Sequence, residues 1–314
     1  MKSLGSFATL PLPAGVRDEA DRLAVSDVRG RISAFVALTK PRIAVMVLIT
    51  VATGFLLGAR GASNPSTLLA TMIGTGLVAA GASTLNQLLE RATDAKMRRT
   101  ARRPLPMRKV SPVEAAWFGL GLSALGLAIL SLSTNLLAAG VAWTTLVLYA
   151  FVYTPLKRLT TLNTAIGAIP GALPPVIGWA AATGRLGPEA WSLFLIVFLW
   201  QFPHFLAIAW LHRVDYARGG HRMLPSIDPR GLLTGRQATI YALALVPAGL
   251  LPCSVGLAGS FYFAGALGLG LFYLAYSVKF WLNVSDQTAR SLMRASFLHL
   301  PAVLLLLLLN PLPA

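Results

Sequence analysis

The chain has 314 residues, of which 55% are hydrophobic and 12% are charged, and its mean hydropathy is +0.67. So little charge cannot cover the surface of a water-soluble domain of this size, which excludes a soluble enzyme or binding module. The formal net charge is +16, and in a soluble protein this would suggest a nucleic-acid partner. The positions of the charges along the chain decide between nucleic acid and membrane.

Residues 1–38 predict a cytoplasmic, partly flexible N-terminal arm, followed by a single membrane-embedded domain over residues 39–314. The arm lacks the apolar core of about 7–15 residues and the small-residue cleavage site of a signal peptide. Acidic residues argue against a transit peptide, and the arm has four of them: Asp18, Glu19, Asp21 and Asp27.

Nine apolar segments follow, each about 18 residues or longer, which is the length that a helix needs to cross a bilayer. They predict an all-α, polytopic bundle of nine transmembrane helices in contact with lipid. The predicted helices cover residues 43–60, 67–89, 114–132, 136–153, 163–181, 191–211, 237–256, 259–281 and 293–311.

Basic residues gather in the arm and in alternate loops. These loops cover residues 90–113, 154–162, 212–236 and 282–292. The loops on the other side carry only Arg60 and Arg185. By the positive-inside rule, we expect a bacterial inner-membrane protein with a cytoplasmic N-terminus and an external C-terminus. The net charge is then a topology signal, and no nucleic-acid partner is expected.

The second predicted helix ends in three oxygen-bearing side chains at a spacing of four residues: Asn86, Glu90 and Asp94. Each step of four turns a helix only about 40° beyond a full circle, so the three side chains share a face. Carboxylate and amide oxygens suit Mg²⁺, which often also binds substrate phosphates. The spacing therefore indicates a metal site at the cytoplasmic surface.

An ordinary charged helix end is the alternative, in which Glu90 pairs with Arg91 and Asp94 pairs with Arg98. Asn86 favours the metal site, because an unpaired amide inside an apolar segment is costly. The crowded bases that follow would repel one another without an anion among them, and either a lipid headgroup or a diphosphate fits. These bases are Arg98, Arg99, Arg102, Arg103, Arg108 and Lys109.

Two other cytoplasmic loops and two membrane segments carry further candidates. Tyr153, Lys157 and Arg158 lie in YTPLKRLTTLN, and Asp215 lies at another helix end. The segment IPGALPPVIGW (169–179) predicts a broken helix, which is tolerated where neighbours or a cavity satisfy the freed backbone groups. WQFPHF places His204 inside the membrane, where an ionisable group is a functional candidate.

These motifs resemble the UbiA superfamily of intramembrane prenyltransferases, and within it the branch that farnesylates protohaem. The run from Asn86 to Pro104 is similar to the first aspartate-rich motif of the superfamily. Four further stretches resemble the haem branch. They are LTKPRI (38–43), YTPLKRLTTLNTAIGAIPGALPPVIGWAAATG (153–184), WQFPHFLAIAW followed by DYARGGHRMLP (200–225), and ARSLMRASFLHLP (289–301). The resemblance spans residues 35–305.

The resemblance implies a central cavity that opens sideways to lipid. There, Mg²⁺-bound farnesyl diphosphate ionises and its allylic carbon joins a vinyl group of haem B, and addition of water gives haem O. A haem A synthase or a terminal oxidase is implied as the partner that takes up the product.

By position, the resemblance also implies roles for individual residues. The implied metal ligands are Asn86, Glu90, Asp94 and Asp215, and with His204, which would contact haem or take part in deprotonation, they form the implied catalytic set. The implied diphosphate-binding residues are Lys40, Arg42, Arg99, Arg103, Lys157 and Arg158. Glu90 stands where the motif usually has Asp. Gly219 stands where the wider superfamily has a second acid, and this form with a single acid is similar to the haem branch.

Two alternatives remain. One is a UbiA-type enzyme that acts on a quinone precursor or chlorophyllide, and the stretches shared with the haem branch argue against it. The other is a lipid or anion transporter, since broken helices and inward-facing bases also suit one. A transporter would not require Asn86, Glu90 and Asp94 in register.

Overall fold

The structure is a computed structural model that describes residues 28–62 and 64–312. These residues form helices and no β-sheet, and nine helical segments among them are long and apolar enough to cross a membrane. The predicted all-α, nine-span architecture is therefore confirmed for the described part of the chain. Most of the predicted N-terminal arm, residues 1–27, lies outside it.

The spanning segments follow one another in chain order. They are α2 (Pro41–Ala59), α3 (Pro65–Asp94), α4 (Pro112–Ser133), α5 (Leu136–Val147), α7 (Asn163–Ala172) with α8 (Pro174–Thr183), α9 (Pro188–Leu211), α12 (Leu232–Ala248) with α13 (Leu251–Ser254), α14 (Ser260–Leu282) and α15 (Asp286–Leu309). A π-helical stretch, Leu148–Tyr153, joins α5 to the short helix α6 (Thr154–Leu156), and the loop after α9 holds α10 (Arg213–Arg218) and α11 (Leu224–Ile227).

Three helices extend further into polar sequence than predicted. α3 continues to Asp94, α12 begins at Leu232, and α15 begins at Asp286, seven residues before the predicted start. A capping box starts α15, in which Ser285 accepts a hydrogen bond from the backbone of Thr288. Capping satisfies backbone donors in a polar first turn, which an apolar window does not detect.

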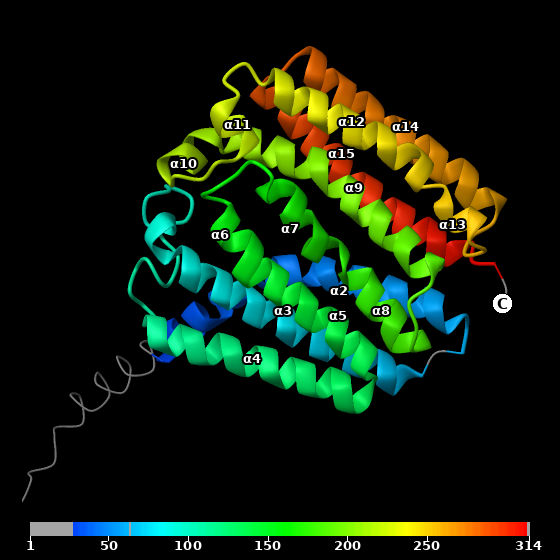
Figure 1. Ribbon diagram of the computed structural model, residues 1–314, viewed down its shortest axis with the longest axis horizontal. Coiled ribbons are helices and arrows are strands. Elements are labelled where there is room, and N and C mark those ends of the chain that lie inside the picture. The colour runs from blue at the N-terminus through cyan, green and yellow to red at the C-terminus, as the bar shows by residue number, and fades with distance from the viewer. Residues whose placement is uncertain (1–27, 63, 313–314) are drawn as a thin grey trace, which may run out of the picture.

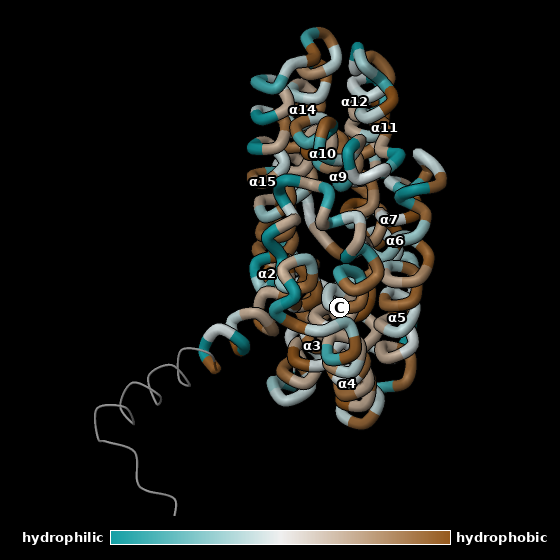
Figure 2. Tube along the Cα trace, turned by 90° about the vertical axis from the view of Figure 1, so that its left-hand side faces the viewer, coloured by the Kyte–Doolittle hydropathy of each residue, from teal (hydrophilic) through white to brown (hydrophobic). Residues whose placement is uncertain are grey.

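The helices form two groups side by side. α9, α12, α14 and α15 pack together in one half, and α3, α4 and α5 pack together in the other (Figure 1). α2 packs against α3 and α8. The loops over residues 95–111, 157–162 and 212–231 lie at one end of the bundle, which we call the loop face. Figure 2 looks onto this end and shows its hydrophilic residues.

Glycines allow the helices that carry the site to pack closely. A Cβ on Gly126 of α4 would lie 2.5 Å from the backbone oxygen of Gly74 of α3, and a Cβ on Gly178 of α8 would clash with the backbone oxygen of Val51 of α2. Small residues at such crossings are typical of membrane helix pairs, whose association depends on close packing.

The last part of the predicted arm also has a defined place. Residues 28–39 are helical, and Ala34 and Leu38 are buried against Leu105, Val110 and Ala115 near the start of α4. Lys40 follows this helix directly, so its backbone is fixed between two packed elements.

The predicted break lies between α7 and α8, at Leu173. Gln201 of α9 donates hydrogen bonds from Nε2 to the carbonyl oxygens of Ala168 (3.1 Å) and Val197 (3.0 Å). A neighbouring amide thus supports the broken segment, in the way expected for irregular backbone at membrane depth.

Candidate active site

A cavity of about 710 Å³ lies between the two groups of helices and reaches the loop face. Its wall follows α3 from Thr75 to Asp94, which corresponds to about 28 Å of helix. Five basic and two acidic side chains line it, and the wall away from them is largely apolar. The charged lining residues are Lys40, Arg42, Arg99, Arg103, Lys157, Glu90 and Asp94.

Asn86 lies at the centre of the polar wall and is buried. Its Oδ1 accepts a hydrogen bond from Lys40 Nζ (3.0 Å), and its Nδ2 donates to Glu90 Oε2 (3.1 Å) and to Thr154 Oγ1 (2.9 Å). The amide therefore links α3 to the start of α2 and to α6. The costly buried amide that the sequence indicated is fully hydrogen-bonded.

The two carboxylates pair with bases from outside their own helix. Lys157 Nζ donates to Glu90 Oε1 (2.8 Å), and Arg103 Nη1 donates to Asp94 Oδ2 (2.7 Å). The alternative of an ordinary helix end predicted the pairs Glu90–Arg91 and Asp94–Arg98, and these pairs do not form among the described residues. Arg91 and Arg98 are exposed, because the face of α3 that carries the acids turns inward.

The second oxygen of Asp94 bears on metal binding. Asp94 Oδ1 is buried and has no hydrogen-bond partner among the described residues. An unpartnered buried carboxylate oxygen is costly unless a ligand reaches it, so the residues fit a hard cation. No three His, Cys, Asp or Glu side chains come together as a metal site in residues 28–62 and 64–312, so the Asn86 amide and phosphate oxygens would complete the coordination.

Lys40 is held in an unusual backbone conformation. It has a φ of 48° in the left-handed region, directly before Pro41, where a non-glycine residue stores about 1–3 kcal/mol of strain. Burial, together with the positive charges of Arg103 and Lys157, lowers the pKa of Lys40 to about 7. A bound anion would favour its charged form.

His204 of α9 lines the cavity from the opposite half of the bundle. Its Nδ1 lies 2.7 Å from Ser296 Oγ of α15, and its ring stacks on Trp200 with centroids 4.9 Å apart. We call Asn86, Glu90 and Asp94 the Asn86 cluster. The structure thus places His204 and the Asn86 cluster on the wall of one cavity.

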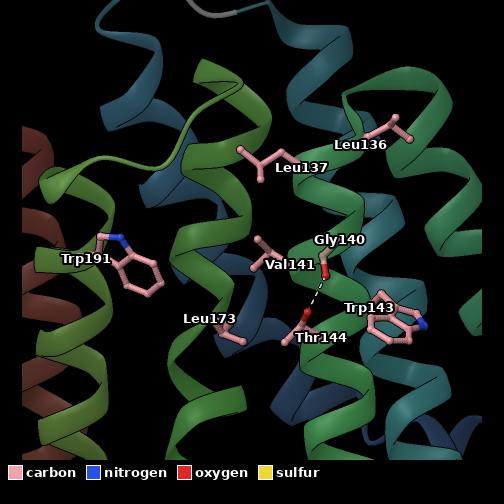
Figure 3. A pocket seen from close by; sticks show the side chains of 8 residues that line it. All are labelled: Leu136, Leu137, Gly140, Val141, Trp143, Thr144, Leu173 and Trp191. Carbon is pink, nitrogen blue, oxygen red and sulfur yellow. Dashed lines mark hydrogen bonds between the residues drawn. The ribbon is translucent and has the colours of Figure 1, made fainter.

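A second hollow, of about 440 Å³, lies on the side of the bundle between α5 and α9 (Figure 3). Leu136, Leu137, Val141, Leu173 and two tryptophans line it, and the hydroxyl of Thr144 is satisfied by the carbonyl of Gly140 at 2.9 Å. Among the described residues, the lining of this hollow is apolar apart from Thr144.

Residues 47–301 match the sequence model of the UbiA prenyltransferase family. The chain belongs to the UbiA prenyltransferase family. Two similar relatives are called protoheme IX farnesyltransferase. The one from Solibacter usitatus is 47% identical over 285 residues, covering 88% of this chain and 98% of that protein. The one from Salinibacter ruber is 44% identical over 276 residues, with the same coverage.

Solved structures share the UbiA fold at lower identity. A structure described in work on digeranylgeranylglyceryl phosphate synthase has a TM-score of 0.75 at 18% identity, covering 89% of this chain and 98% of that one. A UbiA homolog from Archaeoglobus fulgidus, bound to GPP and Mg²⁺, has a TM-score of 0.61 at 15% identity, covering 87% and 99%. The UbiA fold of residues 28–62 and 64–312 is therefore established.

Two residues implied by the UbiA resemblance lie apart from the cavity wall. Asp215 of α10 and Arg158 do not belong to its lining within the described residues. Asp215 Oδ2 accepts a hydrogen bond from the backbone nitrogen of Arg99 (3.3 Å), and its Oδ1 lies 3.7 Å from Arg218 Nη1. The loop over residues 212–231 therefore contacts the loop over residues 95–111 through Asp215.

Sequence reasoning missed His221 as a lining residue. His221 is buried, its Nδ1 has no partner among the described residues, and burial lowers its pKa. The neighbouring Arg222 fixes this loop, because its backbone nitrogen donates to the carbonyl of Lys157 (2.7 Å). The sequence offered one signal for His221, which is its place beside two glycines in a basic loop.

Proposed function

We propose that this chain transfers the farnesyl group of farnesyl diphosphate to a vinyl group of haem B, with addition of water, to give haem O and diphosphate. The observation that carries the proposal is the 47% identity, over 98% of its length, to a protoheme IX farnesyltransferase. The cavity supports it, because charged residues gather near one end and mostly apolar residues line the rest.

Asn86, Glu90 and Asp94 would hold Mg²⁺, and we propose Asp215 as a further ligand from the loop over residues 212–231. The Archaeoglobus fulgidus homolog binds Mg²⁺ together with GPP, and the unpartnered Oδ1 of Asp94 offers an oxygen for a cation. Bound Mg²⁺ would neutralise negative charge on the leaving diphosphate.

The bases of the cavity would bind the diphosphate. Lys40, Lys157 and Arg103 already point at the Asn86 cluster, and prepositioned donors stabilise the charge that develops on the diphosphate as the allylic C–O bond breaks. The remaining proposed diphosphate-binding residues are Arg42, Arg99 and Arg158.

The apolar wall would hold the prenyl tail and keep water away from the allylic cation. Ile177, Val197 and Leu300 come from three different helices and lie along this wall. We propose that His204 contacts haem from the same region. An apolar enclosure also strengthens the electrostatic interactions at the charged end of the cavity, because the local dielectric constant is low.

The same proposal covers location and partners. We propose that the loop face lies in the cytoplasm of a bacterium, with the C-terminus on the outer side of the inner membrane. The concentration of Lys and Arg in the loops of this face supports that orientation. A haem A synthase or a terminal oxidase would take up the product.

The test is a product assay. Membranes that contain the protein are incubated with haem B, farnesyl diphosphate and Mg²⁺, and haem is extracted and weighed by mass spectrometry. We expect haem with an added hydroxyfarnesyl group, and none after Mg²⁺ is removed with EDTA. Absence of product beside an active relative would refute the proposal, and prenylation of an aromatic acceptor instead would favour a quinone-type enzyme.

Asp94→Asn tests the metal site within this assay. The variant keeps the shape of Asp94 and removes its charge, so we expect activity to fall about 100-fold or more. Asp286→Asn is the matched control, since Asp286 pairs with Arg213 outside the cavity. Equal activity of the two variants, at equal amounts of folded protein, would remove Asp94 from the metal site.

A further inference from the structure

A short chain of hydrogen bonds joins α9 to α15 beside the cavity. His204 of α9 and Ser296 of α15 are both buried, with exposed fractions of 8% and 0%. Ser296 Oγ lies 2.7 Å from His204 Nδ1 and 2.6 Å from the carbonyl oxygen of Met293, one helical turn earlier. The proposed binding of diphosphate uses neither contact.

The two distances favour one arrangement of the protons. Two oxygens separated by 2.6 Å need a hydrogen between them, and the Met293 carbonyl has none, so Ser296 donates to it. A serine has only one hydroxyl proton. In this arrangement His204 carries its hydrogen on Nδ1 and donates it to Ser296 Oγ. In the neutral ring, Nε2 then keeps a free lone pair.

The surroundings hold the ring of His204 in this orientation. Trp200 stacks on it with an interplanar angle of 15°, and Trp200 Nε1 donates to the backbone oxygen of Ser296 (3.1 Å). Phe297 packs edge-on, with a centroid distance of 5.2 Å. Nε2 makes no hydrogen bond with any residue that the structure describes, and His204 lines the cavity.

The other histidines of the chain are placed differently. His299 is buried against Tyr273 and does not line the cavity in the described structure, while His212 and His221 lie in the loop after α9. Within the membrane-spanning segments, His204 thus presents the imidazole nitrogen that a ligand in the cavity can reach.

We propose that His204 Nε2 is an axial ligand to the iron of the haem substrate and that Ser296 is the positioning residue that sets its tautomer. This inference rests on the proposed function, in which haem is the acceptor of the farnesyl group. Neutral imidazole is a common haem ligand, and ligating histidines usually donate their other N–H to an oxygen acceptor, as His204 does. The coordinate bond changes no oxidation state and fixes the porphyrin in the cavity.

The test is a haem titration without farnesyl diphosphate. Ferric protohaem is added to the full-length protein in detergent, and the Soret absorption and the electron paramagnetic resonance spectrum report the iron ligand. We expect histidine ligation in the wild type, its loss in His204→Ala and its return when imidazole is added. A protein-free sample of haem, detergent and imidazole is the control, because free imidazole also ligates ferric haem in a micelle. The melting temperature reports whether the variant is folded.

Ser296 is tested by the same spectra. We expect Ser296→Ala to bind haem about 10-fold more weakly with a mixed ligand signal, and Ser296→Thr to keep the wild-type spectrum. Ser291→Ala is the matched control on α15, because Ser291 donates to the carbonyl of Gln287 and is exposed. His299→Gln controls for the second buried histidine, and both controls should match the wild type.

The outcomes separate this inference from the proposed function. A wild-type spectrum in His204→Ala would overturn the ligation, and a wild-type spectrum and affinity in Ser296→Ala would overturn the positioning role. Haem O formation by a protein whose bound haem shows no histidine ligand would overturn the inference and leave the function standing. Absence of both haem binding and product would overturn both.

Discussion

Glu90 stands where the UbiA resemblance led us to expect an aspartate, and its contacts show what the longer side chain does. Glu90 Oε1 accepts from Lys157 Nζ (2.8 Å) while its Oε2 accepts from Asn86 (3.1 Å). The carboxylate thus joins α3 to the residue that follows α6. An aspartate is shorter by one methylene, so its partners would have to move to keep both contacts.

We expect Glu90→Asp to raise the Mg²⁺ concentration for half-maximal activity by about 10-fold, since the charge is kept and the oxygen is moved. The measurement is a Mg²⁺ titration of haem farnesylation. Glu114→Asp is the control, because Glu114 pairs with Arg31 away from the cavity. If Glu90→Asp lowers only the melting temperature and leaves the Mg²⁺ dependence unchanged, Glu90 serves only to pair with Lys157.

The sequence shows at this scale which side chains share a face but not which partners they meet. A spacing of four residues placed Asn86, Glu90 and Asp94 on one wall. Lys157 is 67 residues from Glu90, and Arg103 reaches Asp94 only because its loop folds back. Such pairs depend on loop geometry, which no local pattern encodes, and His221 was missed for the same reason.

At the scale of elements, the α3–α4 crossing decides how firmly the polar wall is held. Gly126 of α4 faces the backbone of α3, with Gly74 O at 2.5 Å and Val78 N at 2.8 Å from a built Cβ. Gly121 on the same helix has nothing within 4 Å of its Cβ. One helix therefore contains a glycine that packing requires and one that it does not.

We expect Gly126→Ala to destabilise the protein by about 1–3 kcal/mol, because backbone cannot yield to the added methyl group. Gly121→Ala should be neutral or stabilising by up to about 1 kcal/mol, because alanine is the better helix former. Thermal unfolding of both variants in detergent provides the comparison. Equal melting temperatures would show that the α3–α4 crossing adapts to a methyl group.

Helix existence was predictable from apolar runs, whereas several helix ends were not. The start of α15 depends on the capping box at Ser285, and the end of α3 depends on polar residues that turn inward. Hydropathy measures the part of a helix that lipid surrounds. It does not measure the polar turns that extend above this part and carry the chemistry.

At the scale of the whole molecule, the charge is divided between the two ends of the bundle. The loop face holds the basic loops around the cavity, and the opposite end carries Arg60, whose Nη2 lies 4.0 Å from Glu189 Oε1, and Arg185. The same bases therefore serve two proposed purposes, orientation in the membrane and binding of diphosphate.

The orientation is tested with single cysteines. Cys253 is the only cysteine of the chain, so Cys253→Ser gives a background for Arg98→Cys on the loop face and Arg185→Cys at the opposite end, both exposed positions. In intact cells, we expect a membrane-impermeant maleimide to label Arg185→Cys and not Arg98→Cys. The reverse pattern would contradict a cytoplasmic loop face.

The resting ion pairs of the cavity have a thermodynamic consequence. A diphosphate that draws Lys157 and Arg103 away leaves two buried carboxylates without counter-ions, and a metal that takes the carboxylates leaves the bases unpaired. A diphosphate or a metal that binds alone must break these buried ion pairs, which costs free energy. The second ligand removes that cost, because it neutralises the groups that the first one leaves unpaired. At the proposed site, Mg²⁺ and diphosphate would therefore bind cooperatively, and each would raise the affinity for the other by the same factor.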